Sequence, residues 1–273
     1  MTSNNAEIGP GLVEGARGFA GTLFAALYGD LVPHAWPAPD PDRDLYRVFH
    51  ERSTAMGWLH DTGPAGLWQM NDAGRQHPLA EASLAAWFQV EAEPVPGDRP
   101  LPLQPFLSCA GDALARVGDV ALDAVQVLLP VQCLDTTSRP EASRSPSLLT
   151  AAWFDDVDPA LRTPVRITLD GGQSPAVLAI ADRLAVIDQA VFAYEAHTTD
   201  RTGIVPPFDD SFWNGPPQHA ITFRGTLAEW SLDAIGWFAA LLADLSARHG
   251  VATPLLFTAS RMRARVEDRV PAP

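Results

Sequence analysis

The clearest pattern in the chain occupies two segments, PVRITLDGGQSPAVLAIADRLAVIDQAVFAYEAHT (164–198) and HAITFRGTLAEWSLDAIGWFAALLADLSARHGVATPLLFTASR (219–261). Apolar and polar residues alternate in parts of both segments, which is typical of half-buried strands. The strands that we expect cover residues 164–170, 189–198, 219–226 and 254–261. Two helices are expected between them, so residues 164–261 have the order β-α-β-β-α-β of ferredoxin-like units.

Both helices have recognisable starts. Ser174 followed by Pro175 predicts a helix that continues to about Val186. Ser231 predicts the start of the longest helix, which Gly250 ends.

A partial repeat of this unit precedes it. Residues 83–92, 119–132 and 147–155 are expected to be strands, and residues 105–117 a short helix. The order β-α-β-β over 83–155 suggests that an α+β unit is repeated over 164–261.

The remaining residues complete the expected organisation. Residues 1–80 lack strong strand patterns and predict a helical and loop segment packed on the core, with an amphipathic helix over 41–57. An eighth strand is expected near Gly66–Met70, residues 81–262 form an α+β domain, and residues 263–273 form a flexible tail. The expected fold class is α+β. It has flanking helices on either a curved antiparallel or mixed sheet or an approximately eight-stranded β-barrel.

Charge and composition exclude several classes of function. The 273 residues include 33 acidic and 19 basic residues, a net charge of -14, and every basic residue is arginine. Such a chain is repelled by nucleic acid and by anionic membranes, and it has no lysine for Schiff-base or P-loop chemistry. No apolar run approaches the ~20 residues that span a bilayer, and the N-terminus has no basic signal region. We therefore expect a cytoplasmic protein that does not insert into membranes.

The familiar catalytic motifs are absent from the sequence. It contains no GxSxG, GxGxxG, GxxxxGK[ST] or HExxH, and its seven histidines show no paired metal spacing. The two cysteines, Cys109 and Cys133, lie in apolar surroundings typical of core positions, with a catalytic thiol or a disulfide as alternatives. We expect no cofactor and no metal, and the sequence does not establish an enzyme.

One group of polar residues could carry acid–base chemistry if strands 189–198 and 219–226 pair. Alternation places Glu195 and His197 on one face of the strand, and Phe192 and Tyr194 on the other. The catalytic hypothesis therefore names Glu195, His197, His219 and Tyr194. The alternative is that Glu195 and His197 lie on a solvated face.

Aromatic residues on the expected strands suggest a ligand cavity. The expected ligand-binding residues are Trp87, Phe88, Trp153, Phe192, Tyr194, Phe223, Arg224 and Phe257. Aromatic residues that line a concave sheet suit an apolar ligand, whose terminal carboxylate Arg166, Arg224 or His197 would anchor. Ordinary core packing is the alternative, and the loop over 199–218 is expected to be either a lid or a dimer contact.

The residue usage and strand order resemble a known family. The chain has no lysine and is rich in Ala, Pro and Arg, and strands are expected over 119–132, 147–155, 189–198, 219–226 and 254–261. In these features, residues 80–262 resemble the small dimeric β-barrel proteins of actinobacterial enediyne biosynthesis, such as that of the dynemicin cluster. The resemblance implies a barrel that binds a long apolar polyketide chain or polyene, and no site residue is carried over from it.

We therefore expect a non-catalytic, homodimeric binding protein of natural-product biosynthesis. It would hold a long apolar chain, such as a polyene, a polyketide intermediate or a fatty acid, in an aromatic-lined barrel. Two alternatives stay open: a cyclase-, isomerase- or thioesterase-like enzyme of the same pathway class, and a dimeric scaffold with a solid core.

Overall fold

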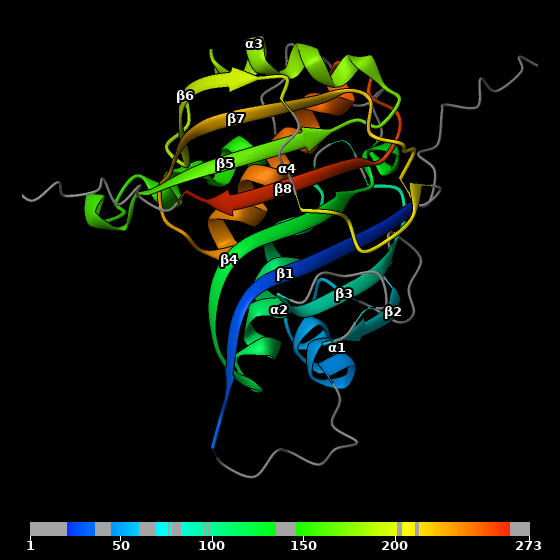
Figure 1. Ribbon diagram of the computed structural model, residues 1–273, viewed down its shortest axis with the longest axis vertical. Helices are drawn as coiled ribbons and strands as arrows, with labels where there is room; N and C mark the ends of the chain where they lie inside the picture. Colours follow the sequence, from blue (N-terminus) through cyan, green and yellow to red (C-terminus); the bar gives the residue numbers. More distant parts are fainter. Residues whose placement is uncertain are drawn as a thin grey trace, which may run out of the picture.

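The computed structural model describes residues 21–35, 45–59, 69–75, 77, 83–95, 97, 99–134, 146–200, 204–210 and 213–262 (Figure 1). The strands in these ranges are β1 (Gly21–Pro33), β2 (Gln69–Gly74), β3 (Leu84–Ala92), β4 (Gly118–Leu129), β5 (Thr163–Asp170), β6 (Phe192–Thr198), β7 (Ala220–Leu227) and β8 (Leu255–Arg261). The α-helices are α1 (Leu45–Ala55), α2 (Leu103–Leu114), α3 (Ile180–Leu184) and α4 (Leu232–Arg248). Short 3-10 helices are η1 (Val131–Cys133), η2 (Pro146–Phe154), η3 (Pro159–Leu161) and η4 (Pro175–Ala179). The amphipathic helix expected over 41–57 is present as α1, and the expected tail at 263–273 lies outside the described residues.

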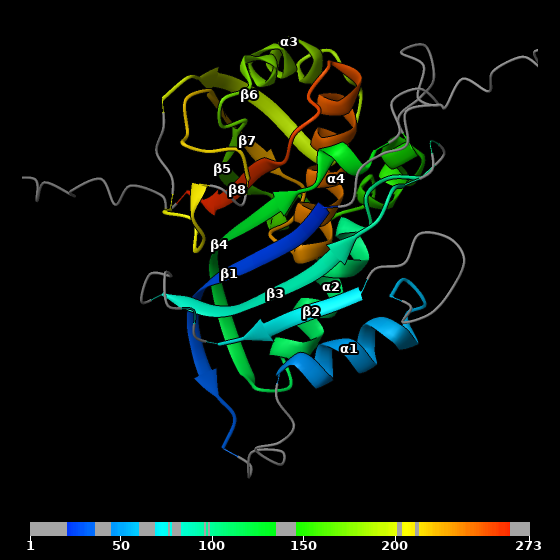
Figure 2. The same ribbon diagram turned by 90° about the vertical axis from the view of Figure 1, so that its right-hand side faces the viewer.

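All eight strands belong to one antiparallel sheet with the order β2-β3-β1-β4-β8-β5-β7-β6. The sheet is open, because β2 and β6 are its two edges, and Figure 2 shows its curvature from the side. The α+β class and the curved sheet with flanking helices are therefore confirmed. The alternative of a closed barrel is not the arrangement that these strands adopt.

The sheet consists of two units with the same order of elements. The first unit comprises β1, α1, β2, β3, α2 and β4, and the second comprises β5, α3, β6, β7, α4 and β8. Within each unit the fourth strand pairs with the first, the first with the third, and the third with the second. The predicted C-terminal order is confirmed, whereas the matching first unit begins at Gly21 and not at residue 83. The units meet where their fourth strands, β4 and β8, pair antiparallel.

Strand β1 contradicts the expectation that residues 1–80 contribute only helix and loop. It lies between β3 and β4 in the first unit, and its residues Leu23–Tyr28 are all buried. A strand that is covered on both faces has no polar alternate positions, so it gives no period-two signal. The expected eighth strand near Gly66–Met70 is β2, which begins slightly later.

The prediction of a strand over 147–155 is wrong, because this segment forms the 3-10 helix η2. A continuous apolar run such as SLLTAAWF does not distinguish a strand from a helix by periodicity, and Pro146 suits the first turn of a helix. The helix expected after Ser174 is present in two parts, η4 and then α3.

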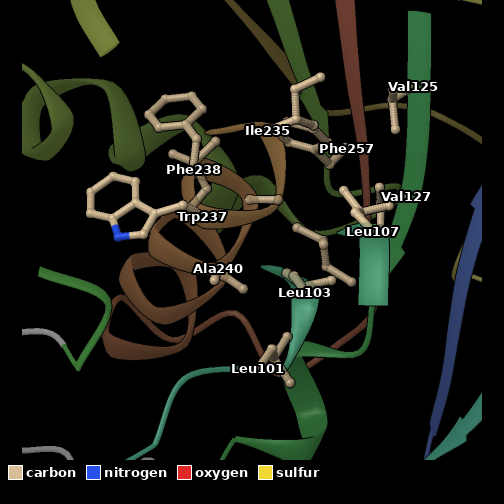
Figure 3. Close-up of a cluster of buried hydrophobic side chains, with 14 of the residues drawn as sticks. Leu101, Leu103, Leu107, Val125, Val127, Ile235, Trp237, Phe238, Ala240 and Phe257 are labelled. Carbon is tan, nitrogen blue, oxygen red and sulfur yellow. The ribbon is translucent and has the colours of Figure 1, made fainter. Parts of the chain in front are cut away.

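The helices cover one face of the sheet (Figure 2). Helix α4 begins after Ser231, whose Oγ accepts a hydrogen bond from the Ala234 N–H at 3.1 Å, as the sequence predicted. It packs directly on α2 of the first unit, so closely that a Cβ at Gly236 would lie 2.8 Å from the Leu103 carbonyl oxygen. Figure 3 shows the core beneath this contact, with Leu107, Phe238 and Phe257 among its side chains. None of the helices described here is long and apolar enough to cross a membrane.

The opposite side of the sheet, here called the open face, carries none of the α-helices that the structure describes (Figure 1). Part of it is covered by the connection from β6 to β7, whose described residues 204–210 and 213–219 we call the strap. A second hydrophobic cluster lies between the strap and the sheet: Phe24, Ala26, Tyr28, Trp87, Ala124, Leu128, Trp213 and Leu256, with Leu84, Ile204 and Phe208 at its margin.

Candidate functional site

Four of the predicted ligand-lining residues belong to the core on the helix side. Phe88, Phe192, Phe223 and Phe257 are all at most 1% exposed. Phe192 packs on Phe238 of α4, with their ring centroids 4.6 Å apart. These rings therefore pack against helix side chains, as the core-packing alternative predicts.

The other four predicted lining residues lie at separate places. Trp87 belongs to the cluster under the strap, and Arg224 lies exposed on the open face. Trp153 is 73% exposed on η2, because this segment is not a strand. Tyr194 lies half-buried on the edge strand β6. The eight residues therefore do not line one common surface.

The predicted catalytic residues are divided by a bulge in β6. The pairing with β7 shifts between Tyr194 and Ala196. Tyr194 and His197 therefore lie on the same face of the sheet, where their partners on β7 are Gly225 and Phe223. The Tyr194 hydroxyl lies 2.6 Å from His197 Nδ1. The prediction that Glu195 and His197 share a face is therefore wrong, because one extra residue in a strand reverses the alternation beyond it.

Glu195 and His219 do not join this pair. Glu195 Oε1 accepts a hydrogen bond from Thr226 Oγ1 at 3.4 Å, on the open face. His219 precedes β7, whereas His197 pairs with Phe223 in the middle of that strand. The four residues from His219 to Phe223 span about 13 Å along the strand. Of the four predicted catalytic residues, the structure therefore brings together only Tyr194 and His197.

The two cysteines occupy core positions and are not bonded to each other. Cys133 is fully buried, and burial raises the pKa of its thiol to about 12. Cys109 is 1% exposed, and its Sγ accepts a hydrogen bond from Trp58 Nε1 at 3.4 Å. Since the nucleophile in thiol chemistry is the thiolate, the environment of Cys133 suits packing and not catalysis.

The open face of the second unit has a regular polar pattern that follows from the strand register. The arginine row crosses β4, β8, β5, β7 and β6 as Ala124, Ser260, Arg166, Arg224 and Ala196. Two residues further along each strand, the threonine row is Gln126, Thr258, Thr168, Thr222 and Thr198. Directly opposed residues on adjacent strands have their Cβ atoms about 4.5–5.5 Å apart. The two rows are therefore neighbouring lines of side chains on one surface.

The threonine row holds the connection from β6 to β7 in place. Gln126 is 1% exposed; its Oε1 accepts from the Tyr28 hydroxyl at 3.0 Å and its Nε2 donates to the Ile204 carbonyl at 2.7 Å. The Thr222 hydroxyl donates to the Asp200 carbonyl at 2.9 Å and lies 3.0 Å from the Thr168 hydroxyl. Because these polar groups form hydrogen bonds within the chain, we assign the threonine row a structural role.

The arginine row has the opposite character. Arg224 is exposed and Arg166 half-buried, and the two face each other directly across β5 and β7. Neither guanidinium forms an ion pair or hydrogen bond with any residue in the described parts of the chain. Like charges directly opposite each other on a sheet are destabilising, and a negatively charged ligand on the two arginines would remove this repulsion.

Short side chains flank the two arginines along the row. Ser260 lies opposite Arg166 on β8, and Ala196 lies opposite Arg224 on β6. An anion above this row can therefore reach the guanidinium N–H groups and the Ser260 hydroxyl from the solvent side. We take Arg166, Arg224 and Ser260 as the candidate site.

The sequence contains a signal for this site in the alternating polar residues of three strands. Polar residues occupy alternate positions in VRITLD, ITFRGT and LFTAS, where the intervening positions are apolar. This alternation predicts one polar face on each strand, and antiparallel pairing then aligns the polar positions. Arg166 and Arg224 were expected as carboxylate anchors, whereas Ser260 was missed.

No metal centre is seen among the residues that the structure describes, where no three His, Cys, Asp or Glu side chains are grouped so as to hold an ion. The resemblance to enediyne biosynthesis proteins stays a prediction. Comparisons with protein families, with curated proteins and with solved structures found no match to this chain.

Proposed function

We propose that this chain is a non-catalytic binding protein for an acidic small molecule, whose negatively charged group lies on Arg166 and Arg224. The observation that carries the proposal is the directly opposed pair of arginines on the open face, without an acidic partner among the described residues. Each guanidinium offers several N–H donors in a planar fork that matches carboxylate and phosphate oxygens.

The position of the ligand differs from the one expected from sequence. The aromatic residues on the helix side are packed against α-helices, as with Phe192 on Phe238, so they do not support an apolar chain inside the sheet. The polar surface beside the strap supports binding on the open face instead. A role in natural-product biosynthesis and a homodimeric state stay expectations that rest on the resemblance.

The enzyme alternative has less support than binding. Glu195 lies on the other face of β6 from His197, and His219 lies about 13 Å along the strand from the partner of His197. An acid–base pair needs its two groups within hydrogen-bond reach of the same substrate atoms. The Tyr194–His197 contact alone does not supply such a pair.

The test is to identify what the full chain retains on purification. Native mass spectrometry and solvent extraction would compare the wild type, the double variant Arg166→Gln/Arg224→Gln, and Arg116→Gln, an exposed arginine after α2. We expect an acidic small molecule on the wild type and on Arg116→Gln, and its loss from the double variant. Retention of the same molecule by the double variant, or a ligand without an acidic group, would overturn the proposal.

A further inference from the structure

We infer that the acidic group recognised by the arginine row is a dianion of the phosphate monoester class, carried by a small molecule. This inference rests on the proposed function and specifies the chemistry of its ligand.

The charge of the arginine row favours a dianion. Arg166 and Arg224 are directly opposed, so two positive charges lie on adjacent strands. A monoanion, such as one carboxylate, leaves one of them uncompensated, whereas a phosphate monoester carries a charge of about -1.5 to -2 at neutral pH. A single dianionic group therefore relieves the whole repulsion between the two guanidinium groups.

Among the described residues, the acidic residues near the row are Asp170, Asp200 and Glu195, and none of them forms an ion pair with Arg166 or Arg224. Asp170 lies four residues along β5 from Arg166, about 13 Å away, which exceeds the screening length of about 8–10 Å in physiological salt. Its Oδ1 accepts from the Gly172 N–H at 2.9 Å. Glu195 accepts a hydrogen bond from the Thr226 hydroxyl and forms no ion pair with a described arginine. Neither guanidinium is therefore paired with a carboxylate of a described residue, so both can bind an anion.

The donors come from three strands. Arg166 lies on β5, Arg224 on β7, and Ser260 on β8, and the three are consecutive in the row. A carboxylate has two oxygens in one plane, whereas a phosphate monoester presents three terminal oxygens in a tetrahedral arrangement. Three neighbouring donor side chains from three adjacent strands therefore match the phosphate group better.

The rest of the chain restricts the molecule that carries this group. The net charge of -14 repels extended polyanions and anionic membranes over long range. A small molecule with one phosphate is repelled much less, because it brings little charge besides the group that the arginines neutralise. We therefore assign a small phosphate monoester as the ligand.

Two probes of similar shape and different charge test the inference. Methyl phosphate is a dianion above its second pKa of about 6, whereas methyl sulfate stays a monoanion. Calorimetric titrations of the full chain would be made at constant ionic strength and pH 7.5. We expect methyl phosphate to bind at least tenfold more tightly than methyl sulfate, and Arg166→Gln or Arg224→Gln to weaken it at least tenfold. Arg116→Gln is expected to leave the affinity unchanged.

Lowering the pH changes the charge of methyl phosphate but hardly its shape, so it tests which of the two the affinity depends on. Between pH 7.5 and pH 5.5, the dianionic fraction of methyl phosphate falls about fourfold for a second pKa of about 6, and its affinity should fall by the same factor. Equal binding of both probes that depends on the two arginines would overturn the dianion and leave the proposed function standing. Binding of neither probe would also overturn the inference, and the retained-ligand comparison above would then decide the proposed function separately.

Discussion

The open faces of the two units differ, although the units have the same order of strands and helices. In the first unit this face carries Phe24, Tyr28 and Trp87, which are at most 9% exposed beside the strap. In the second unit the corresponding first and third strands carry Arg166 and Arg224, which face solvent. The order of elements thus sets which strands pair, while the alternate residues of each strand decide whether a face is covered or available to a ligand.

The largest effect is expected when the covered face of the first unit is emptied. The Phe24 ring is stacked on Trp87 at 5.8 Å and meets Phe208 of the strap edge-on at 5.3 Å. Phe24→Ala should therefore lower the free energy of unfolding by about 3–5 kcal/mol. Arg224→Ala on the exposed face, the matched control, should not lower it, and should raise it by no more than about 1 kcal/mol because the repulsion with Arg166 is lost. Urea denaturation measures both, and equal effects would contradict the distinction between the two faces.

A smaller effect is expected at the contact that joins the units. A Cβ at Gly236 of α4 would lie 2.8 Å from both the Leu103 carbonyl oxygen and the Gln104 Cα, which are backbone atoms of α2. Gly236→Ala should cost about 1–3 kcal/mol of stability by thermal or urea unfolding. Gly111→Ala meets only the flexible end of Leu232 and should cost less. A larger loss at Gly111 would show that the helices do not approach as described.

Removing one charge from the arginine row should stabilise the protein in the absence of ligand. Arg166→Gln ends the repulsion with Arg224, so the free energy of unfolding should rise by about 0.2–1 kcal/mol at low salt. The gain should shrink at high salt, where exposed charges are screened. A loss of stability on this substitution would mean that Arg166 has a structural role.

The smallest effect is a pH dependence on the covered face. The ring of His77 lies edge-on to Trp87 at 5.1 Å and to Phe24 at 6.2 Å. Burial lowers the pKa of His77 below 6.5, and Asp72 partly opposes this. The unfolded chain then binds the proton more readily, so stability should fall as the pH drops below about 6.5. Urea unfolding at pH 7.5 and 5.5 should show a larger loss for the wild type than for His77→Gln, and equal losses would contradict the assignment.

The second unit could be predicted from sequence largely because its strands are half-buried. VRITLD and ITFRGT alternate between a core face and an open face, and this period identified β5 and β7. The helix start at Ser231 was also readable, because capping is a local interaction.

The first unit was harder to predict because its central strand is covered on both faces. The run LFAALY of β1 is apolar throughout, and what covers its outer face is the strap, more than 170 residues later in the chain. Such a strand is stabilised by residues far away in the sequence, so the local pattern of apolar and polar residues does not predict it. The bulge at Glu195 was equally unreadable, since it shows only in the pairing with β7.

The pairing of β4 with β8 also has a consequence for the order of folding. It joins Ala124 to Ser260 and Leu129 to Leu255, residues more than 120 positions apart, whereas β1, β3 and β4 pair within residues 21–129. During synthesis the first unit therefore leaves the ribosome with one edge of β4 unpaired until β8 follows. An exposed edge strand of this kind invites pairing with other chains, so the interval before β8 emerges is when the nascent protein is most prone to aggregate.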